Sequence, residues 1–480
     1  MNNETAMSPR KMRVRKLANE QAANREKWIA RNSFFYEEDY RYMRFLIPKG
    51  LRILDLGCGT GHLLAELNPA RGVGVDLSPG MVDVARARYP HLEFHVGDIE
   101  DFDFISSLSG PFDAIVLSDT LGSLDDCQTT ISNLHCLCSP DTRIVISYYS
   151  KLWEPILSLA RLVNFKMPQE EQNVLSPTDI ANFLSLSDFE VIRREWRQLL
   201  PRKCFGLGIL VNRYLAPFPV IRAACLRHYV VGRSLQVTRN SNPSATVLVP
   251  CRNERGNIEE AVRRIPKFCE DIEILFVEGH SKDDTLTEIY RVIAAYPHLD
   301  IKVLVQDGKG KGDAVRKGFE NARGNVLMIL DADLTVPPEA LVKFYKAIAL
   351  GKGEFINGSR MIYPMEKDAM RFLNFLANHA FSWLFSWLLN QRFTDTLCGT
   401  KVLYKSHYGK IAEGRKYFGD FDPFGDFDLI FGAAKLNLKV VEIPVAYSSR
   451  TYGVTQISRF THGWLLLRMV VFAFRKLKAF

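Results

Sequence analysis

The sequence predicts an α/β protein of two domains, each built on a mainly parallel sheet. Its 480 residues exceed the usual size of one domain and suffice for two domains of roughly 200 residues. In both halves, short apolar runs that end in glycine or acidic residues alternate with helical patterns. A polar, turn-rich stretch separates the two series. We therefore expect domains at residues 1–236 and 245–480, joined by a linker at residues 237–244.

Composition and charge narrow the class of protein. Hydrophobic residues make up 47% and charged residues 24%, which favours folded domains over long disordered segments. The nine cysteines are scattered and form no pair of C-x-x-C motifs, so a reducing cytoplasm is expected rather than a disulfide framework or structural zinc. The basic residues from Arg10 to Lys16 precede no apolar core, so no secretory signal is expected.

The first domain opens with a strand, a glycine-rich turn and a helix. The strand is expected at residues 51–56, and the helix at residues 63–67 follows Asp55-Leu56-Gly57-Cys58-Gly59-Thr60-Gly61. Glycines in such a turn let backbone approach a ligand closely, and the helix start offers free amide donors. A second strand at residues 72–75 ends in Asp76, whose carboxylate can accept both hydroxyls of a ribose.

Further strands extend the same sheet. A third, at residues 92–96, ends in Gly97-Asp98-Ile99, where Asp98 can accept from an adenine amino group and Ile99 can cover a ring face. A fourth, at residues 112–117, ends in Ser118-Asp119, and residues 142–147, 189–196 and 228–232 complete the predicted sheet.

These four motifs in this order resemble the class I S-adenosylmethionine-dependent methyltransferases, over roughly the first half of the chain. The resemblance implies a Rossmann-like domain that binds S-adenosylmethionine, with Asp55 and Gly57 at its amino acid part, Asp76 at the ribose, and Asp98 and Ile99 at the adenine. The turn is not G-x-G-x-x-G, which argues against NAD. The implied cofactor-binding set is Asp55, Gly57, Gly59, Gly61, Asp76, Asp98 and Ile99.

The methyl acceptor is not readable from these motifs. No Asn-Pro-Pro-Tyr type motif follows the fourth strand, which argues against methylation of amide or nucleobase nitrogen. Residues 31–36 predict either a helix that closes over the cofactor or a set of packing aromatics.

The second domain repeats the strand, loop and helix pattern. Strands are expected at residues 246–249, 273–277, 302–305 and 326–330, with a helix at residues 258–265. Parallel strands bring their end loops to one sheet edge, and these loops carry Glu254, Glu278, Lys309-Gly310-Lys311-Gly312 and Asp331-Ala332-Asp333.

This half, from Ala245 to about Arg459, resembles the inverting glycosyltransferases with a GT-A fold, most closely those that make polyprenyl-phosphate sugars such as dolichyl-phosphate mannose or glucose. A nucleoside diphosphate leaves only when its charge is neutralised, so the resemblance implies that Asp331 and Asp333 hold a divalent cation, Mg²⁺ or Mn²⁺. Both reach one ion only if the chain turns at Ala332. The implied substrate-binding set is Pro250, Arg252, Glu254, Glu278, Lys309, Lys311, Arg360, Arg371 and Arg450.

Within that set, Glu254 and Glu278 are expected to read the base or ribose, and the three arginines to pair with phosphates. The family usually carries Asp in place of Glu278, Gln in place of Thr335 and Lys in place of Gln456. Asp428 aligns with the family's acidic residue near the acceptor, so it is the expected general base, with Asp426 as substitute; the alternative is a capped helix start. A phosphate acceptor is already largely dianionic and needs a base less.

Two apolar helices are expected near the C-terminus, at residues 372–389 and 464–476. Residues 443–480 contain no Asp or Glu, so this end carries much of the net charge of +8. Such helices suit a membrane surface with anionic headgroups, or else the core or a dimer contact.

Together the motifs predict a bifunctional cytoplasmic enzyme, either soluble or peripheral at the inner face of the cytoplasmic membrane. One domain would transfer a methyl group and the other a sugar from a nucleotide sugar to polyprenyl phosphate or a glycan, in one glycan or glycolipid pathway. The alternatives are a non-catalytic cofactor-binding scaffold beside the glycosyltransferase, and a soluble acceptor. Nucleic acid is not an expected partner, because the diphosphate set has no role there.

Overall fold

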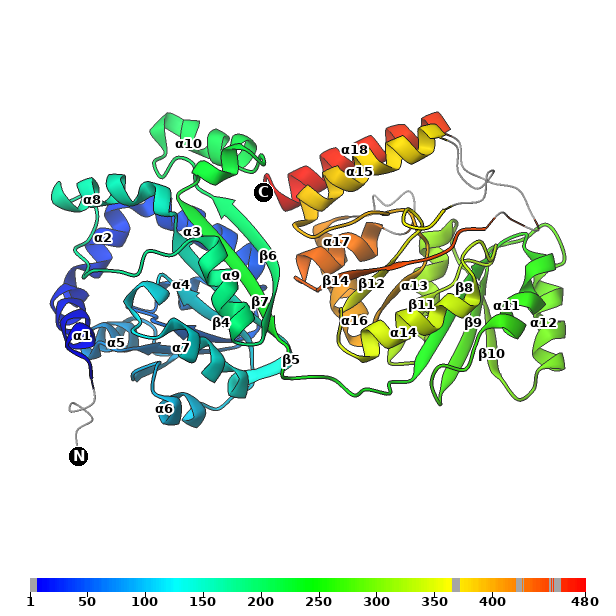
Figure 1. The fold of residues 1–480 in the computed structure, drawn as a ribbon, viewed down its shortest axis with the longest axis horizontal. Helices are drawn as coiled ribbons and strands as arrows, with labels where there is room; N and C mark the ends of the chain where they lie inside the picture. The colour runs from blue at the N-terminus through cyan, green and yellow to red at the C-terminus, as the bar shows by residue number, and fades with distance from the viewer. Residues whose placement is uncertain are drawn as a thin grey trace. The chain divides into compact units, whose positions relative to one another are not determined.

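The computed structural model describes residues 7–364, 372–419, 425, 427–448, 450, 452 and 459–480. The chain divides into two compact units, Met1–Thr238 and Arg239–Lys478. Each unit contains one seven-stranded sheet flanked by helices (Figure 1). The predicted α/β class with two sheets is therefore confirmed.

The first sheet has the strand order β3-β2-β1-β4-β5-β7-β6, in which the first five strands are parallel. β7 runs antiparallel to both β5 and β6. From β1 the chain adds β2 and β3 on one side and β4 and β5 on the other. A parallel sheet has a crevice that can bind a ligand at the point where the strand order switches direction, here between β1 and β4. The strands are β1 (Arg52–Leu56), β2 (Arg71–Asp76), β3 (Glu93–Val96), β4 (Phe112–Ser118), β5 (Cys138–Tyr149), β6 (Phe189–Arg197) and β7 (Arg227–Ser234).

Helices cover the first sheet, and several begin at a side chain that caps free backbone amides. Ser78 accepts from Met81 N, and Ser176 forms a capping box with Asp179. The predicted helix at residues 31–36 is instead two helices that meet at Asn32. The helices are α1 (Pro9–Gln21), α2 (Arg25–Arg31), α3 (Ser33–Leu46), α4 (His62–Glu66), α5 (Pro79–Arg88), α6 (Phe102–Ser107), α7 (Cys127–Asn133), α8 (Glu154–Leu162), α9 (Pro177–Leu186) and α10 (Leu207–Leu210).

The second sheet has the order β10-β9-β8-β11-β13-β12-β14. β10, β9, β8 and β11 are parallel, so their carboxyl ends meet at one edge. β13 is antiparallel to both of its neighbours, β11 and β12. The strands are β8 (Ala245–Cys251), β9 (Ile272–Glu278), β10 (Asp300–Val305), β11 (Val326–Ile329), β12 (Phe355–Ser359), β13 (Lys401–Tyr404) and β14 (Val440–Pro444).

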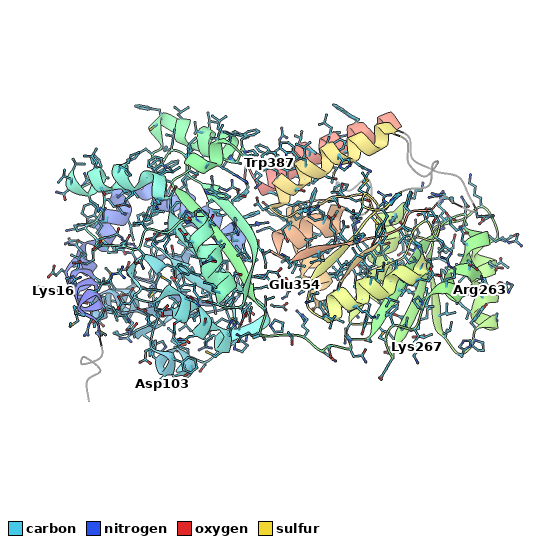
Figure 2. All side chains as sticks on the ribbon, in the orientation of Figure 1. Lys16, Asp103, Arg263, Lys267, Glu354 and Trp387 are labelled. Carbon is cyan, nitrogen blue, oxygen red and sulfur yellow. The ribbon has the colours of Figure 1, made fainter. Side chains whose placement is uncertain are left out.

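Helices also cover this sheet, and α15 and α18 lie side by side (Figure 1). Trp387 of α15, labelled in Figure 2, contacts Phe474 of α18 with ring centroids 5.8 Å apart. No helix among the described residues combines the length and apolar character needed to cross a bilayer. The helices are α11 (Ile258–Arg264), α12 (Thr285–Ala295), α13 (Lys311–Asn321), α14 (Leu341–Ala349), α15 (Phe372–Leu389), α16 (Lys405–Gly414), α17 (Phe427–Lys435) and α18 (Arg459–Leu477).

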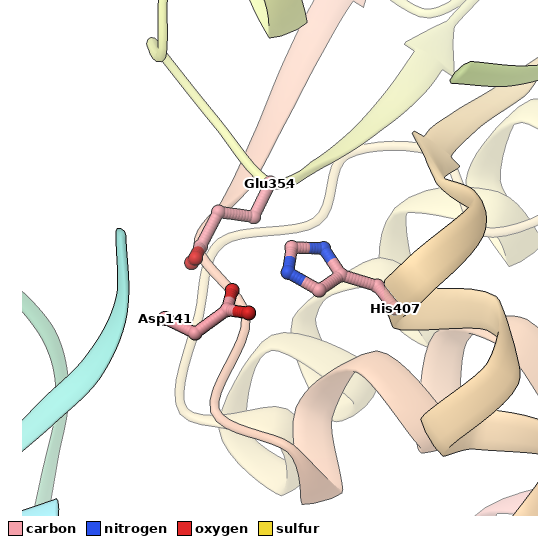
Figure 3. Close-up of side chains that lie close together, drawn as sticks. All are labelled: Asp141, Glu354 and His407. Atoms are coloured by element: carbon pink, nitrogen blue, oxygen red, sulfur yellow. The ribbon is translucent and has the colours of Figure 1, made fainter. Parts of the chain in front are cut away.

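The amino end of the second sheet carries buried polar side chains with structural partners. Glu354, before β12, and His407 of α16 lie close together (Figure 3). Glu354 accepts from the backbone of Lys439 at 2.8 Å, and His407 lies 3.1 Å from the guanidinium of Arg239. Asp331 follows β11 at the opposite edge of the same sheet. Glu354 and His407 therefore belong to the scaffold rather than to the predicted diphosphate site.

Gly324 packs directly on backbone at the entry to β11, which gives a test of this architecture. A Cβ at position 324 would lie 2.4 Å from the backbone nitrogen of Thr246. Backbone in a sheet cannot move aside, so Gly324→Ala should destabilise the second unit by about 2 kcal/mol or more. Calorimetry of the full chain should show a lower unfolding temperature. Gly414→Ala is the matched control, because a Cβ there meets nothing within 4 Å; equal melting of both variants would contradict this packing.

Candidate cofactor and diphosphate sites

The glycine turn after β1 is held against β2. The amides of Gly57 and Cys58 both donate to the carbonyl of Val75, at 2.8 and 3.0 Å. Gly61 has φ +75, and a Cβ there would lie 2.6 Å from the ring of Phe94. The turn therefore requires glycine for its backbone conformation and for its close packing.

Beside this turn lie the carboxylates at the ends of β1 and β2, of which Asp55 is buried and Asp76 is half-buried. Asp76 accepts from the amides of Gly59 at 2.8 Å and Ser78 at 2.9 Å. Asp55 has one carboxylate oxygen without a hydrogen-bond partner. Burial, reinforced by the charge of Asp76, raises the pKa of Asp55 to about 7. A buried oxygen without a partner is costly, so this end of the site suits a ligand that donates to it.

A cavity of about 220 Å³ brings together most of the predicted cofactor residues. Its walls include Asp98, Ile99 and one face of α1. Gly61 does not line it, and Asp55 lines the neighbouring larger cavity. The predicted residues in the smaller cavity are Gly57, Gly59, Asp76, Asp98 and Ile99.

Lys11 of α1 closes the Asp98 end of this cavity. Its ammonium lies 2.5 Å from Asp98 and 2.9 Å from Glu100. Burial would lower the pKa of Lys11, but its hydrogen bonds to Asp98 and Glu100 outweigh that effect and raise it. The sequence gives no sign of this contact, because residues 11 and 98 are far apart in the chain.

A larger cavity of about 470 Å³ adjoins the first. Gly57, Ser118 and Asp119 line both cavities. Aromatic side chains form much of the wall of the larger cavity, among them Phe35, Tyr36 and Tyr149. The aromatic side chains of the predicted segment 31–36 therefore line a cavity. Asp119 follows β4 with φ +61, a conformation that non-glycine residues rarely adopt.

A buried arginine holds the carboxylate of Asp119 in place. Arg227 of β7 pairs with Asp119 and, at 3.2 Å, with Asp39 of α3. Tyr229 donates to Asp39 at 2.5 Å, so the arginine has two acidic partners and one of them is itself anchored. Burial raises the pKa of Asp119 even though Arg227 opposes the shift. Asp119 was recognised as a strand end in the sequence, but its position between two cavities depends on the fold.

Arg25 is a second functional candidate that the motifs do not reveal. It lines both cavities, and its guanidinium contacts Met167 Sδ at 3.5 Å. Within the described part of the chain, no carboxylate forms an ion pair with it. A guanidinium in this position favours an anionic ligand group.

In the second unit, Asp331 lies against Lys311 and Gly399. Lys311 begins α13, and its ammonium is 2.7 Å from Asp331. Burial by itself would raise the pKa of Asp331, but Lys311 outweighs it and holds the pKa below its ordinary value. A Cβ at position 399 would lie 1.9 Å from an Asp331 oxygen, so glycine leaves the space around this carboxylate.

Asp333 is joined to Glu254 through Arg450. The guanidinium lies 2.5 Å from Asp333 and 3.8 Å from Glu254. Asp333 also accepts from the amide and hydroxyl of Thr335, the residue that replaces the family's Gln. Burial raises the pKa of Glu254 to about 7, although Asn257 and Arg450 oppose the shift. The structure thus brings these three predicted residues together.

The donor atoms at this edge fit a hard divalent cation. Asp331 and Asp333 offer carboxylate oxygens, which Mg²⁺ and Mn²⁺ prefer, and Gly399 keeps a side chain out of the space beside them. Lys311 and Arg450 add positive charge of the kind that a diphosphate requires.

The remaining predicted substrate residues differ in their surroundings. Glu278 is buried at the end of β9 and accepts from Ser281 N at 2.5 Å. Arg360 forms a two-point ion pair with buried Asp395, at 2.7 and 2.9 Å, so it fixes a loop. That loop is also tied to Glu442, which accepts from Thr394 N at 2.9 Å. At the end of β8, Pro250 is half-buried and Arg252 is exposed, and Lys309, after β10, is also exposed. Arg371 lies outside the described residues.

Asp428 lies in the first turn of α17, paired with two arginines. Its carboxylate is 3.3 Å from Arg316 and 2.9 Å from Arg415. Both of these contacts are ion pairs within the second unit, so the Asp428 carboxylate is engaged by two guanidinium groups. Asp426, the substitute candidate, lies outside the described residues.

Comparison with known families matches each unit to a different one. Residues 29–194 match the methyltransferase domain, and residues 246–410 match glycosyl transferase family 2. A solved SAM-dependent methyltransferase of Thermotoga maritima, a possible histamine N-methyltransferase, covers 46% of this chain and 99% of its own, with 14% identity and a TM-score of 0.36.

Curated relatives match the second unit. A dolichol-phosphate mannosyltransferase of Pyrococcus furiosus is 37% identical over 120 residues, which cover 24% of this chain and 33% of that protein. An undecaprenyl-phosphate 4-deoxy-4-formamido-L-arabinose transferase of Sodalis glossinidius is 24% identical over 220 residues, which cover 44% and 62%. The chain spans about a third of the length of the first relative and less than two thirds of the second.

The raised pKa of Asp55 predicts a pH dependence of cofactor binding. A cationic amino group binds the ionised carboxylate, so S-adenosylmethionine affinity should rise with pH below about 7, by up to about tenfold per unit. The same shift has the opposite effect on folding in the absence of ligand. Because the pKa of Asp55 is raised from 3.8 in the folded chain, the free energy of unfolding decreases as pH rises toward 7.

Isothermal titration calorimetry between roughly pH 5.5 and 7 measures this linkage while the ligand's amino group stays protonated. Asp55→Asn should bind more weakly and without the pH dependence. Asp103→Asn, on the exposed α6, should behave as the parent chain. An unchanged pH profile in Asp55→Asn would assign the linkage to another group.

Proposed function

We propose that this chain, a fusion of a methyltransferase domain with a glycosyl transferase family 2 domain, performs two group transfers in one glycan or glycolipid pathway. The first unit transfers a methyl group from S-adenosylmethionine to an oxygen or nitrogen. The second transfers a sugar, with inversion, from a nucleotide-diphosphate sugar to polyprenyl phosphate or a glycan.

The observation that carries the methyl transfer is the pair of adjoining cavities. The smaller one holds Gly59, Asp76, Asp98 and Ile99, which suit the adenosyl part, while Asp55 and Arg25 offer opposite charges to a zwitterionic amino acid part. S-adenosylmethionine supplies a methyl group activated on a sulfonium. The acceptor must lie in the larger cavity so that its reacting atom meets the shared wall.

Asp119 is the proposed proton acceptor at that wall. A hydroxyl or N–H group loses its proton when its oxygen or nitrogen is methylated to a neutral product, and Asp119, which lines both cavities, can take that proton. Arg227 holds its carboxylate in place from the buried side. Lys166 lines the larger cavity too, and burial lowers the pKa of its ammonium to about 8, so it adds a group that titrates near neutral pH.

For sugar transfer we assign Asp331 and Asp333 to a divalent cation and Lys311 and Arg450 to the diphosphate. The cation neutralises charge that develops on the leaving diphosphate. Glu254 and Glu278 are proposed to contact the nucleoside. A phosphate acceptor is already an anionic nucleophile, so the ion-paired state of Asp428 is compatible with it. The relatives that transfer sugars to dolichol phosphate or undecaprenyl phosphate support this acceptor.

The α15 and α18 pair supports a peripheral site at the inner face of the cytoplasmic membrane. Leu466, Met469 and Ala473 of α18 are buried, as the core-helix alternative predicts. The other face exposes apolar and basic side chains together, which is the composition of helices that lie on anionic bilayers. The exposed side chains are Trp383, Trp464, Leu467, Arg468, Val471 and Arg475.

Product analysis tests the whole assignment. The purified chain receives a panel of nucleotide sugars, polyprenyl phosphate and S-adenosylmethionine, and the products are identified by mass. Steady release of S-adenosylhomocysteine excludes the scaffold alternative. Transfer only to a water-soluble glycan selects the soluble-acceptor alternative, and a methyl group found solely on an unrelated molecule refutes the shared pathway.

Asp331→Asn should reduce sugar transfer by at least about a hundredfold, because the variant loses a charged ligand of the cation. S-adenosylmethionine binding should be unchanged. Asp307→Asn, a similar change at an exposed residue paired with Lys317, should keep full activity. Normal transfer by Asp331→Asn with added Mg²⁺ or Mn²⁺ would remove Asp331 from the cation site.

Asp119→Asn should lower methyl transfer by about a hundredfold or more while S-adenosylmethionine binding is retained. The amide preserves the shape of the side chain but cannot take a proton. The product mass should then show the sugar without the methyl group. Asp83→Asn, on the exposed surface of α5, is the matched control; equal methylation by both variants would exclude Asp119.

A further inference from the structure

The larger cavity of the first unit opens on an apolar surface. Ile156, Leu159, Val163 and Phe165 line the cavity and yet remain about half exposed, so they form its mouth. Beside them, Leu162 is 81% exposed. A mouth with apolar side chains that water still reaches is an unusual entrance for a polar, freely soluble substrate.

A second segment continues this surface. In residues 202–222, Phe205 is fully exposed, Leu210 is 58% exposed and Val220 is 88% exposed. The Arg202 guanidinium joins the two segments, 5.5 Å from the ring centroid of Phe165. Trp153 also donates to the carbonyl of Ala224, two residues after the second segment, at 2.8 Å. α8 and α10 lie at the same end of the first unit (Figure 1). We call residues 151–165 and 202–222 together the mouth surface.

Basic residues outnumber acidic ones in the two segments of the mouth surface. Residues 201–225 contain no Asp or Glu but carry Arg202, Lys203, Arg213 and Arg222. The single acid of residues 151–165 is Glu154, which already accepts from Arg161 at 2.7 Å. Exposed apolar side chains in segments where basic residues outnumber acidic ones match the interface of a bilayer that contains anionic lipids.

We propose that the mouth surface docks on an anionic lipid bilayer and that the methyl acceptor is the headgroup of a lipid-linked molecule. This inference rests on the proposed methyl transfer and adds the class of acceptor. The apolar mouth accommodates the lipid end of such a molecule. The aromatic wall and Asp119 receive its polar end, so the acceptor passes from membrane to cavity without its chain crossing water.

The charge pattern selects a bilayer over a second copy of the chain. A symmetric contact would bring the basic side chains of two mouth surfaces together, which like-charge repulsion opposes. Anionic headgroups complement the same side chains. Salt should therefore weaken the docking, because part of the attraction is between exposed charges.

Vesicle binding tests the proposal with the full chain. The variant Leu162→Ser/Phe205→Ser/Val220→Ser changes exposed side chains that do not line either cavity. It should bind vesicles of phosphatidylcholine and phosphatidylglycerol at least about tenfold more weakly than the parent in co-sedimentation. Both chains also carry Trp464→Ser/Leu467→Ser, so that binding through α18 does not mask the difference. Leu186→Ser, an exposed apolar residue of α9, is the matched control and should change nothing.

A second measurement places lipid at the mouth itself. Phosphatidylglycerol with brominated acyl chains quenches tryptophan that reaches the bilayer, so quenching should decrease in Trp153→Phe. Parent-like vesicle binding by the triple variant, an equal loss in Leu186→Ser, or a change only in oligomeric state by light scattering would overturn the proposal. S-adenosylmethionine binding is measured in parallel: its loss in the parent chain would contradict the proposed function, whereas normal cofactor binding without vesicle binding contradicts only this inference.

Discussion

Both units depend on one constraint, which is that parallel strands covered on both faces release their carboxyl ends at a single edge. Backbone groups inside the sheet are paired, so the chain can approach a ligand only where the strands stop. In the first unit this edge carries Asp55, Asp76 and Asp119, and in the second it carries Glu278 and Asp331. Residues from distant parts of the chain meet there because hydrogen bonding fixes the strand register.

Concentrating charge at a covered edge creates an electrostatic problem that the two units solve with basic partners. Arg227 stabilises Asp39 and Asp119, and Lys311 stabilises Asp331. A buried charge without a partner would destabilise the folded chain by several kcal/mol, so these ion pairs are what allows the carboxylates to lie at the sites. Asp55 instead keeps an oxygen without a partner, and the Arg25 guanidinium has no carboxylate partner in the described part of the structure. Opposite unmatched charges of this kind are suited to a zwitterionic ligand.

The two proposals about membranes give the fusion a physical rationale. The mouth surface of the first unit and the exposed face of α15 and α18 in the second each combine apolar and basic side chains. A lipid-linked molecule diffuses in the plane of the bilayer and exchanges slowly with water. Two active sites on one chain that both draw from the bilayer would therefore work on a shared lipid-linked pool without a soluble intermediate.

Local patterns in the sequence determined the two sheets and most of the residues around their edges. All seven strands of the first sheet and four of the second were predicted from local sequence, several of them from apolar runs that end in glycine or acidic residues. The short strands β12, β13 and β14 were recognised only as motif positions. β12 and β13 are buried along their whole length, so no alternation of apolar and polar residues marks them in the sequence. Family motifs likewise named Asp76, Asp98, Asp331 and Arg450 without showing their partners.

Tertiary structure decided how those residues are used. Lys11 reaches Asp98, Arg227 reaches Asp119, and Arg360 is committed to Asp395 rather than left open to a ligand. Each pairing joins positions far apart in the sequence, so it depends on sheet register and helix packing, which no local pattern encodes. The aromatic cavity and its apolar mouth arise in the same way. Sequence alone therefore determined the chemistry available to each unit, and burial and long-range pairing decided which groups face a ligand.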